Sequence, residues 1–180
     1  MDINKADYWT IIKFGSLELL LEKLRTEEKN IKEVVNSIDK NGISLLGKSL
    51  MSRNFDIANF LLDNNAKVNI ISNDECNEWH YLAANINYTG AVELANRLVD
   101  LGVDLNLKDK AFGNSAIWSL TQEVLKKRTR EGNDLIVKCL EKRHGGDSLK
   151  KSSGLGGSVV SNNILRNGYR LPVHHTISEK

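Results

Sequence analysis

The stretch FDIANFLLDNNAKVN, residues 55–69, recurs as VELANRLVDLGVDLN at residues 92–106. Both copies contain an acidic residue, an Ala-Asn pair, an Asp and a final Asn in the same order. The acidic residues Asp56 and Glu93 are 37 positions apart, and so are Asn69 and Asn106. A constant offset over the whole block identifies a repeated structural unit, and this repeat decides the fold.

The repeated block has the spacing of an amphipathic helix. Ile57, Phe60 and Leu61 follow the i, i+3, i+4 pattern of one buried face. Two partial copies of this helix are GSLELLLEKL at 15–24 and GNDLIVKCLEKRHGGD at 132–147. We therefore predict four such helices along the chain.

A loop and a shorter apolar segment precede each helix from the second unit onward. The loops NSIDKNG (36–42) and NLKDKAFG (106–113) both have Asp followed by Gly, and the middle loop has Ser72 in that position. The apolar segments, each predicted to be a helix, are 44–51, 77–84 and 115–122. No single unit of loop, helix, turn and helix can bury its apolar faces, so the units must stack.

This pattern resembles the ankyrin repeat, a unit of about 33 residues with a T-P-L-H motif. The T-P-L-H positions here are 44–47, 77–80 and 115–118, and none of them has the proline. The resemblance covers roughly residues 8–147 and implies an all-α solenoid of stacked helix-turn-helix units with short hairpin-like loops. The expected repeats span approximately 6–38, 39–71, 72–108 and 109–147.

His80 occupies the histidine position of that motif, and in the family this residue ties neighbouring loops together. The alternative is chemistry, because Cys76 and His80 have the spacing of a nucleophile and its base. Elsewhere, GLGG at 154–157 is not a phosphate-binding loop, and the adjacent His174 and His175 do not form a metal-binding pair. We predict no enzyme, and no catalytic, cofactor-binding or metal-binding residues.

Three segments exceed the repeat length: 26–31, 85–90 and 123–133. The last segment either extends a helix or forms a loop, and it contains Lys126, Lys127, Arg128 and Arg130. This basic cluster is either an anion or nucleic-acid contact or a solvated helix end, where cations are favourable.

Residues 148–180 form a Gly- and Ser-rich extension, predicted to be a cap on the last unit or a flexible tail. Cys76 and Cys139 lie far apart and are expected to be reduced. The chain has 180 residues and a formal net charge of +2, which does not favour nucleic acid as the partner. No signal peptide or membrane span is visible, so a cytoplasmic location is expected.

The resemblance implies that a partner protein binds the concave face, formed by the loop tips and the exposed side of the first helices. Phe112 and Tyr81 are the aromatic candidates for anchors. The sequence thus predicts a non-catalytic module, favoured to be a monomer, that acts by scaffolding or steric inhibition. The alternative function is that of an immunity protein or antitoxin that neutralises a bacterial toxin. A nucleic-acid-associated regulator that uses the basic cluster at 126–130 is less favoured. The predicted contact residues are Lys48, Ser52, Asp74, Glu75, Glu78, Tyr81, Asn85, Tyr88, Lys110, Phe112, Ser119 and Gln122.

Overall fold

The computed structural model describes residues 2–143, and the regular structure in this range is helical. The only extended pairing in the described range is two isolated bridges, Ile38 with Ser44 and Lys108 with Ser115. The predicted all-α class is therefore confirmed for these residues, and the extension 148–180 lies outside them. The helices are α1 (Tyr8–Phe14), α2 (Leu17–Thr26), α3 (Ile31–Val34), α4 (Leu45–Met51), α5 (Phe55–Asp63), α6 (Glu78–Ala83), α7 (Ala91–Asp100), α8 (Ala116–Lys127) and α9 (Arg130–Arg143).

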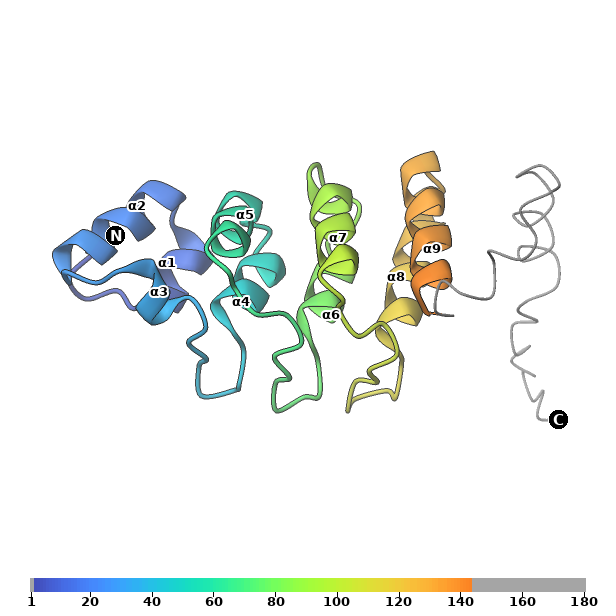
Figure 1. The fold of residues 1–180 in the computed structure, drawn as a ribbon, viewed down its shortest axis with the longest axis horizontal. Coiled ribbons are helices and arrows are strands. Elements are labelled where there is room, and N and C mark those ends of the chain that lie inside the picture. The colour runs from blue at the N-terminus through green and yellow to red at the C-terminus, as the bar shows by residue number, and fades with distance from the viewer. Residues whose placement is uncertain (1, 144–180) are drawn as a thin grey trace, which may run out of the picture. The chain divides into compact units, whose positions relative to one another are not determined.

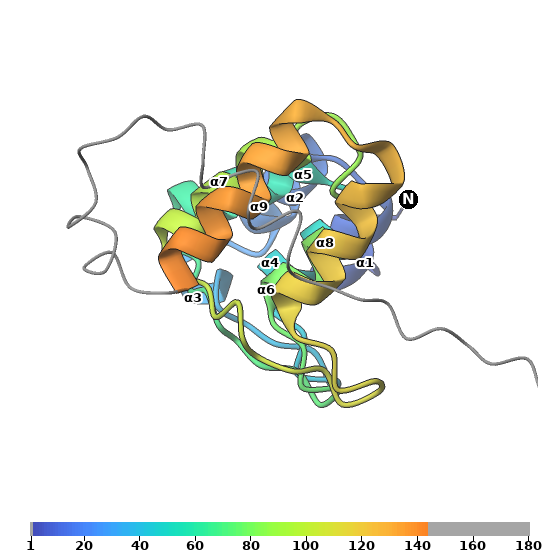
Figure 2. The same cartoon turned by 90° about the vertical axis from the view of Figure 1, so that its right-hand side faces the viewer.

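The helices form pairs that follow one another in a single row (Figure 1). Within each pair the first helix packs on the second: α1 on α2, α4 on α5, α6 on α7 and α8 on α9. Between pairs, first helices pack on first helices and second helices on second helices. The view along the row shows these two layers, with the long loops projecting together on one side (Figure 2).

Two of the predicted insertions contain helix. The segment 26–31 leads into the extra helical turn α3, which Asn30 begins with a capping box to Glu33. The segment 123–133 is mostly helical, because α8 continues to Lys127 and α9 starts at Arg130. The break between these helices falls at Arg128, whose backbone is left-handed with φ of 51°.

Serine side chains begin the first helices of the second and fourth pairs. Ser44 Oγ accepts a hydrogen bond from the Gly47 backbone N at 2.9 Å, and Ser115 Oγ accepts one from the Trp118 backbone N at 3.4 Å. Each bond satisfies an N–H group that has no partner within its helix. These serines occupy the T position of the motif, so the repeat sets the start of the helix.

The apolar positions of the repeated block form a continuous core along the row. Ile57 and Leu61 of α5 are fully buried, and so are the equivalent Leu94 and Leu98 of α7. Because each second helix lies between its own first helix and the neighbouring pairs, these side chains join one cluster that extends from α1 to α9.

A polar link also recurs between the second helices. Arg97 of α7 donates to Asn59 Oδ1 at 2.6 Å and to Asp63 Oδ1 at 2.7 Å on α5. In the next pair, Lys138 of α9 donates to Asp100 Oδ2 at 2.9 Å and to the Asn96 carbonyl at 3.4 Å on α7. Asn59 and Asn96 are equivalent in the repeat, as are Asp63 and Asp100.

A charged cluster closes the first pair. The Glu27 carboxylate accepts hydrogen bonds from the Tyr8 hydroxyl at 2.7 Å and from Lys29 Nζ at 3.0 Å. It also pairs with Lys23 Nζ at 2.9 Å, and the buried Lys23 donates in addition to the Ile3 carbonyl at 3.0 Å. The hydrogen bonds from Lys23, Tyr8 and Lys29 lower the pKa of Glu27 to about 2.

We expect the Glu27 cluster to make the chain sensitive to acid. The folded pKa of about 2 is below the ordinary value of 4.5, so this contribution to stability is present above pH 4.5 and is lost as pH falls toward 2. Glu27→Gln should therefore lower the free energy of unfolding above pH 4.5 and flatten its decline between these pH values. Urea unfolding followed by circular dichroism measures both effects. The control is Glu22→Gln, at an exposed position of α2, the helix that Glu27 follows. A decline in Glu27→Gln as steep as in the parent chain would contradict the assignment.

Candidate functional site

Three loops, 36–44, 69–77 and 106–115, form the edge of the row that Figures 1 and 2 show projecting away from the helices. We call this surface the loop edge. The Asn73 backbone N donates to the Asn41 carbonyl at 2.9 Å, and the Lys110 backbone N donates to the Asp74 carbonyl at 2.9 Å. Main-chain hydrogen bonds therefore hold the three tips side by side.

Each loop is also stabilised from within by a polar side chain at the predicted Asp position. Asp39 Oδ1 accepts from two backbone N–H groups of its own loop at 2.8 and 2.9 Å, and Asp109 does the same at 2.6 and 3.2 Å. In the middle loop Ser72 Oγ accepts from the Cys76 backbone N at 3.3 Å. The serine thus replaces the aspartate with a single bond.

Glycine at 42 allows the middle loop to approach the first. Gly42 has φ of 75°, a left-handed conformation that favours glycine. A Cβ atom at this position would lie 3.2 Å from the Ser72 Cα atom, which is a main-chain contact. Glycine at 42 therefore serves both the turn and the contact between loops, whereas Gly113, with φ of 66° and nothing within 4 Å of an added Cβ atom, serves the turn alone.

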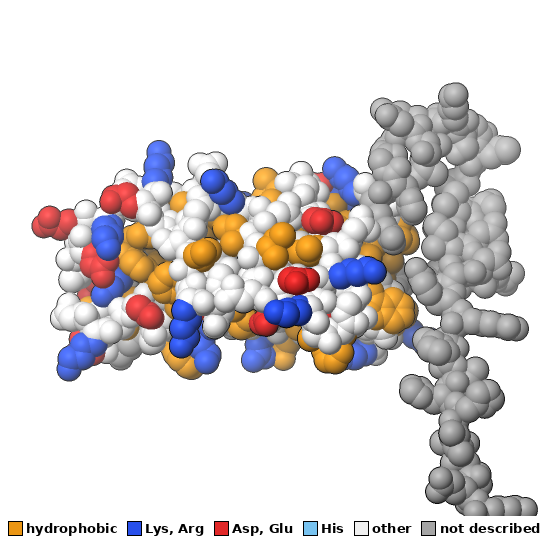
Figure 3. All heavy atoms as spheres, turned by 90° about the horizontal axis from the view of Figure 1, so that it is seen from below, with side chains coloured by type: hydrophobic (Ala, Val, Ile, Leu, Met, Phe, Trp, Pro, Cys, Tyr) orange, Lys and Arg blue, Asp and Glu red, His pale blue; other side chains and the backbone are white. Residues whose placement is uncertain are grey.

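The predicted loop-tip residues are at the surface. Asp74, Glu75, Lys110 and Phe112 are all exposed, and Phe112 has 83% of its surface accessible. Figure 3 views the row from the loop side and shows positive and negative side chains interspersed, with apolar side chains between them. A mixed surface of this kind, with exposed apolar side chains, is typical of protein contacts rather than of phosphate binding.

The predicted contact residues on the first helices differ in their solvent exposure. Lys48, Ser52 and Ser119 are half-buried, and Gln122 is exposed. Tyr81 is also half-buried, because its ring packs against Gly47 of α4, where an added Cβ would lie 3.1 Å from a ring carbon. Burial raises the pKa of Tyr81, and Ser72 beside its hydroxyl opposes that rise. Tyr81 therefore contributes packing between α4 and α6 as well as surface.

Glu78 corrects the prediction, since it is not a surface contact. It is 1% exposed, and its carboxylate accepts from the backbone N of Asn69 at 2.8 Å, of Ile70 at 3.3 Å and from Ser44 Oγ at 3.3 Å. Burial raises its pKa, and these donors oppose the rise. The side chain joins α4, α6 and the middle loop. The helical pattern placed it on an exposed face because periodicity does not register a loop that folds over a helix start.

Asn85 also serves the scaffold. Its Nδ2 donates to the Leu50 carbonyl at 2.9 Å and to the Met51 carbonyl at 3.2 Å. These carbonyls lie in the last turn of α4, where no intrahelical donor remains. The predicted contact residue is therefore engaged in tying the third pair to the second.

Tyr88 lies in the turn between α6 and α7, on the side of the row opposite the loops. It is 50% exposed, and Arg53 from the α4–α5 turn lies over its ring at 4.6 Å. The structure therefore separates Tyr88 from the loop-tip residues with which it was grouped.

The contacts of His80 favour the scaffold interpretation. Its Nδ1 lies 3.2 Å from the Asn77 backbone N and 2.9 Å from Asn77 Oδ1. Burial lowers the pKa of His80, and the backbone carbonyls of Asn114 and Leu107 in the next loop oppose that shift. Asn77, which is fully buried, donates from Nδ2 to the Asp104 carbonyl at 2.9 Å. Asn77 thus connects α6 to the loop that follows, and His80 holds Asn77 at the start of α6.

The cysteines lack the activation that a nucleophile needs. Cys76 Sγ donates to the Asp74 carbonyl at 3.6 Å, while His80 is engaged with Asn77. Burial raises the pKa of the Cys76 thiol, and raises that of the buried Cys139 to about 12. A raised pKa opposes the thiolate form that reacts. His174, His175 and the GLGG segment lie outside the described residues.

The basic cluster at the end of α8 is partly paired. Lys126 Nζ lies 2.5 Å from the Glu123 carboxylate, and Arg130 Nε lies 3.8 Å from Asp134. Lys127 Nζ donates to the Asn87 carbonyl at 3.2 Å. Carboxylates thus pair with Lys126 and Arg130, whereas Lys127 contacts a neutral carbonyl.

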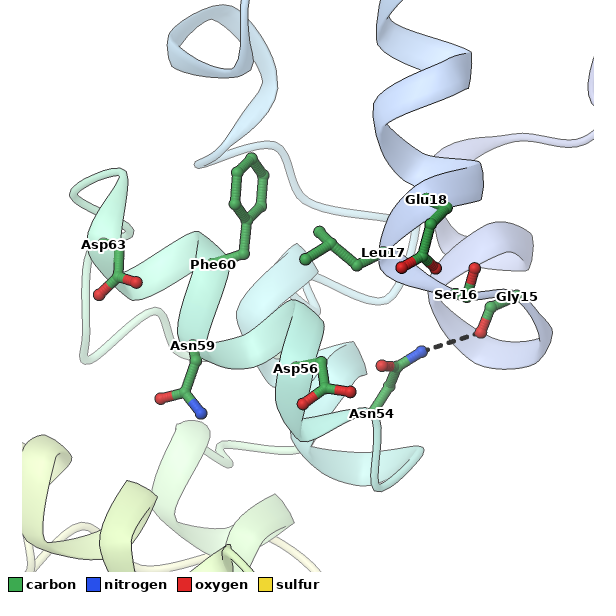
Figure 4. Close-up of a pocket in the computed structure, with 9 residues that line it drawn as sticks. All are labelled: Gly15, Ser16, Leu17, Glu18, Asn54, Asp56, Asn59, Phe60 and Asp63. Atoms are coloured by element: carbon green, nitrogen blue, oxygen red, sulfur yellow. Dashed lines mark hydrogen bonds between the residues drawn. The ribbon is translucent and has the colours of Figure 1, made fainter.

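A hollow of about 630 Å³ lies between α2 and α5, on the side of the second helices (Figure 4). Leu17 and Phe60 provide apolar surface, and Glu18 stands at the end of α2 nearest the hollow. Asn59 and Asp63 also line it, but both accept hydrogen bonds from Arg97. We assign no ligand to this hollow.

Neither the scan against models of protein families nor the search of curated proteins finds a match for this chain. Within residues 2–143, none of the helices combines the length and apolarity that crossing a lipid bilayer demands. The described part of the chain also holds no group of three or more His, Cys, Asp or Glu side chains suited to a metal ion.

We expect Glu78→Ala to lower the free energy of unfolding by about 2–4 kcal/mol, because it empties a buried position and leaves the N–H groups of Asn69 and Ile70 and the buried Ser44 hydroxyl without their acceptor. Chemical unfolding followed by circular dichroism measures the loss. Glu75→Ala in the same region should change stability by less than about 0.5 kcal/mol, since that side chain is exposed. Equal effects of the two substitutions would show that Glu78 is not a structural link.

For His80→Ala we expect a loss of about 1–3 kcal/mol, because a half-buried, bonded ring is removed. Thermal and urea unfolding report it directly. Unchanged stability together with a lost activity would reject the structural role and restore a chemical one.

Proposed function

We propose that this chain is an ankyrin-repeat protein that binds a partner protein through the loop edge and the adjoining surface of the first helices. In that family the loop tips and first helices form the concave binding face. The observation that carries the proposal is the loop edge itself, whose tips are joined by main-chain hydrogen bonds. Its backbone is thereby ordered before binding, which reduces the entropic cost of association.

Side chains at the loop tips are available for recognition because the backbone and the internal Asp and Ser bonds maintain the loop shape. Phe112 is the strongest anchor, since an apolar ring this exposed gains most by burial in a partner. Asp74, Glu75 and Lys110 surround it with both signs of charge, which provide specificity more than affinity. The module would act by scaffolding or by covering a functional surface of its partner.

An immunity or antitoxin role is a narrower form of the same proposal, in which the covered surface belongs to a toxin. The identity of a protein bound by the loop edge decides between this role and that of an adaptor. The paired state of Lys126 and Arg130 makes nucleic acid the weaker alternative.

The test is affinity capture of a partner with the tagged chain, followed by titration of the purified pair by calorimetry. Phe112→Ala should weaken binding by about 2 kcal/mol, roughly thirtyfold, because a hot-spot side chain is truncated. Val137→Ala, an exposed apolar residue on the second helix α9 of the same unit, is the matched control and should change affinity little. Equal affinities of Phe112→Ala and the parent chain would contradict binding through the loop edge.

A further inference from the structure

The turns that connect the two helices of each pair form a second edge, opposite the loops. We call this surface the turn edge; its side chains come from 13–16, 52–55, 84–90 and 127–130. Figure 2 shows the α6–α7 and α8–α9 turns on the same side of the row, away from the loops. Nothing in the proposed function uses this surface.

Side-chain hydrogen bonds from the turns connect neighbouring helix pairs. Asn54 Nδ2 donates to the Gly15 carbonyl at 3.1 Å, and Asn85 Nδ2 donates to the Met51 carbonyl at 3.2 Å. Asn87 Nδ2 donates to the Glu123 carbonyl at 2.9 Å, and Lys127 Nζ donates back to the Asn87 carbonyl. The turn edge is therefore ordered along its length before any partner arrives.

The turn edge pairs exposed aromatic rings with cations. Phe14 is 68% exposed, and Lys13 Nζ lies 4.7 Å from its ring centre. Tyr88 and Arg53 repeat this arrangement across two neighbouring turns, at 4.6 Å. Lys13, Phe14, Arg53 and Thr89 line a shared hollow of about 410 Å³. Within the described residues, Lys13, Arg53, Lys127 and Arg128 have no carboxylate at ion-pair distance.

Two of these four cations, both arginines, occupy positions where the backbone conformation favours another residue. Arg53 and Arg128 follow α4 and α8 with φ of 61° and 51°. Glycine has the lowest cost at a left-handed helix end, and a long side chain is strained there. The left-handed backbone does not itself require arginine at either turn, and the ring of Tyr88 is the contact that Arg53 makes there.

We propose that the turn edge binds an acidic segment of a protein partner that also carries an apolar side chain. The inference rests on the proposed protein-binding function and adds a second contact surface to it. The unpaired cations supply charge complementarity, and Phe14 and Tyr88 supply apolar contact. Two carboxylates on this surface, Asp56 in the hollow and Glu123 beside the basic cluster, favour a peptide over a nucleic acid as the partner. A nucleic-acid strand carries a charge at every nucleotide and meets both carboxylates, whereas a peptide can place a neutral residue opposite each.

The test measures fluorescence anisotropy of a labelled glutamate- and leucine-containing peptide titrated with the full chain near physiological ionic strength. Arg53→Gly/Arg128→Gly removes two cations and relieves the left-handed strain, so thermal unfolding should show unchanged or raised stability. The affinity of this double variant for the peptide should be about tenfold lower than that of the parent chain. The charge-matched control is Lys40→Ala/Lys110→Ala, which removes two cations from the loop edge. The control should change the affinity for the peptide less than about twofold.

Three results would overturn the inference: no binding of the peptide, equal loss in both double variants, or tighter binding of a labelled oligothymidine strand than of the peptide. The last would assign the turn edge to nucleic acid. The partner found by capture separates this inference from the proposed function. A partner that Phe112→Ala weakens and Arg53→Gly/Arg128→Gly leaves unchanged would refute the turn edge alone, and the proposed function would stand.

Discussion

Each helix pair of this chain has two apolar sides, and only a neighbouring pair can cover them. Leu94 and Leu98 of α7 are buried because α5 lies on one side and α9 on the other. Stability therefore accumulates along the row through contacts between neighbours, as in other stacked-repeat chains. Every other feature of the structure, including the alignment of the loops and of the turns, depends on this packing being in register.

Apolar packing alone does not determine that register. Apolar contacts have no preferred direction, so one helix pair could shift along another at a small cost in free energy. The polar links between pairs have directions, and a shift would leave them unpaired. Glu78 joins the second and third pairs, Asn77 joins the third unit to the following loop, and Arg97 joins α7 to α5. A buried carboxylate with three donors is costly to misplace, so such groups oppose slipped arrangements more than they add net stability.

Much of the fold was predictable from the sequence, and much of the surface was not. The 37-residue offset located α5 and α7, and Ser44 and Ser115 marked helix starts, because periodicity and capping are local properties. The burial of Glu78 and the engagement of Asn85 depend on segments from neighbouring units, which a single helical pattern does not describe. The ion pair of Asp63 with Arg97 could have been predicted from the sequence, since Asp100 repeats Asp63 at the 37-residue offset and pairs with Lys138.

The two edges of the row are held together by different chemistry, and this difference bears on what each can do. The loop tips are joined by main-chain hydrogen bonds and by Asn73 Nδ2, which donates to the Lys40 carbonyl at 3.2 Å, so side chains such as Phe112 and Lys110 can change without loosening the loops. The turns are joined through the side chains of Asn54, Asn85 and Asn87, so those positions cannot change freely. Variation for new partners is therefore least costly on the loop edge. On the turn edge it is confined to exposed side chains that do not link one turn to the next, such as Phe14 and Arg128.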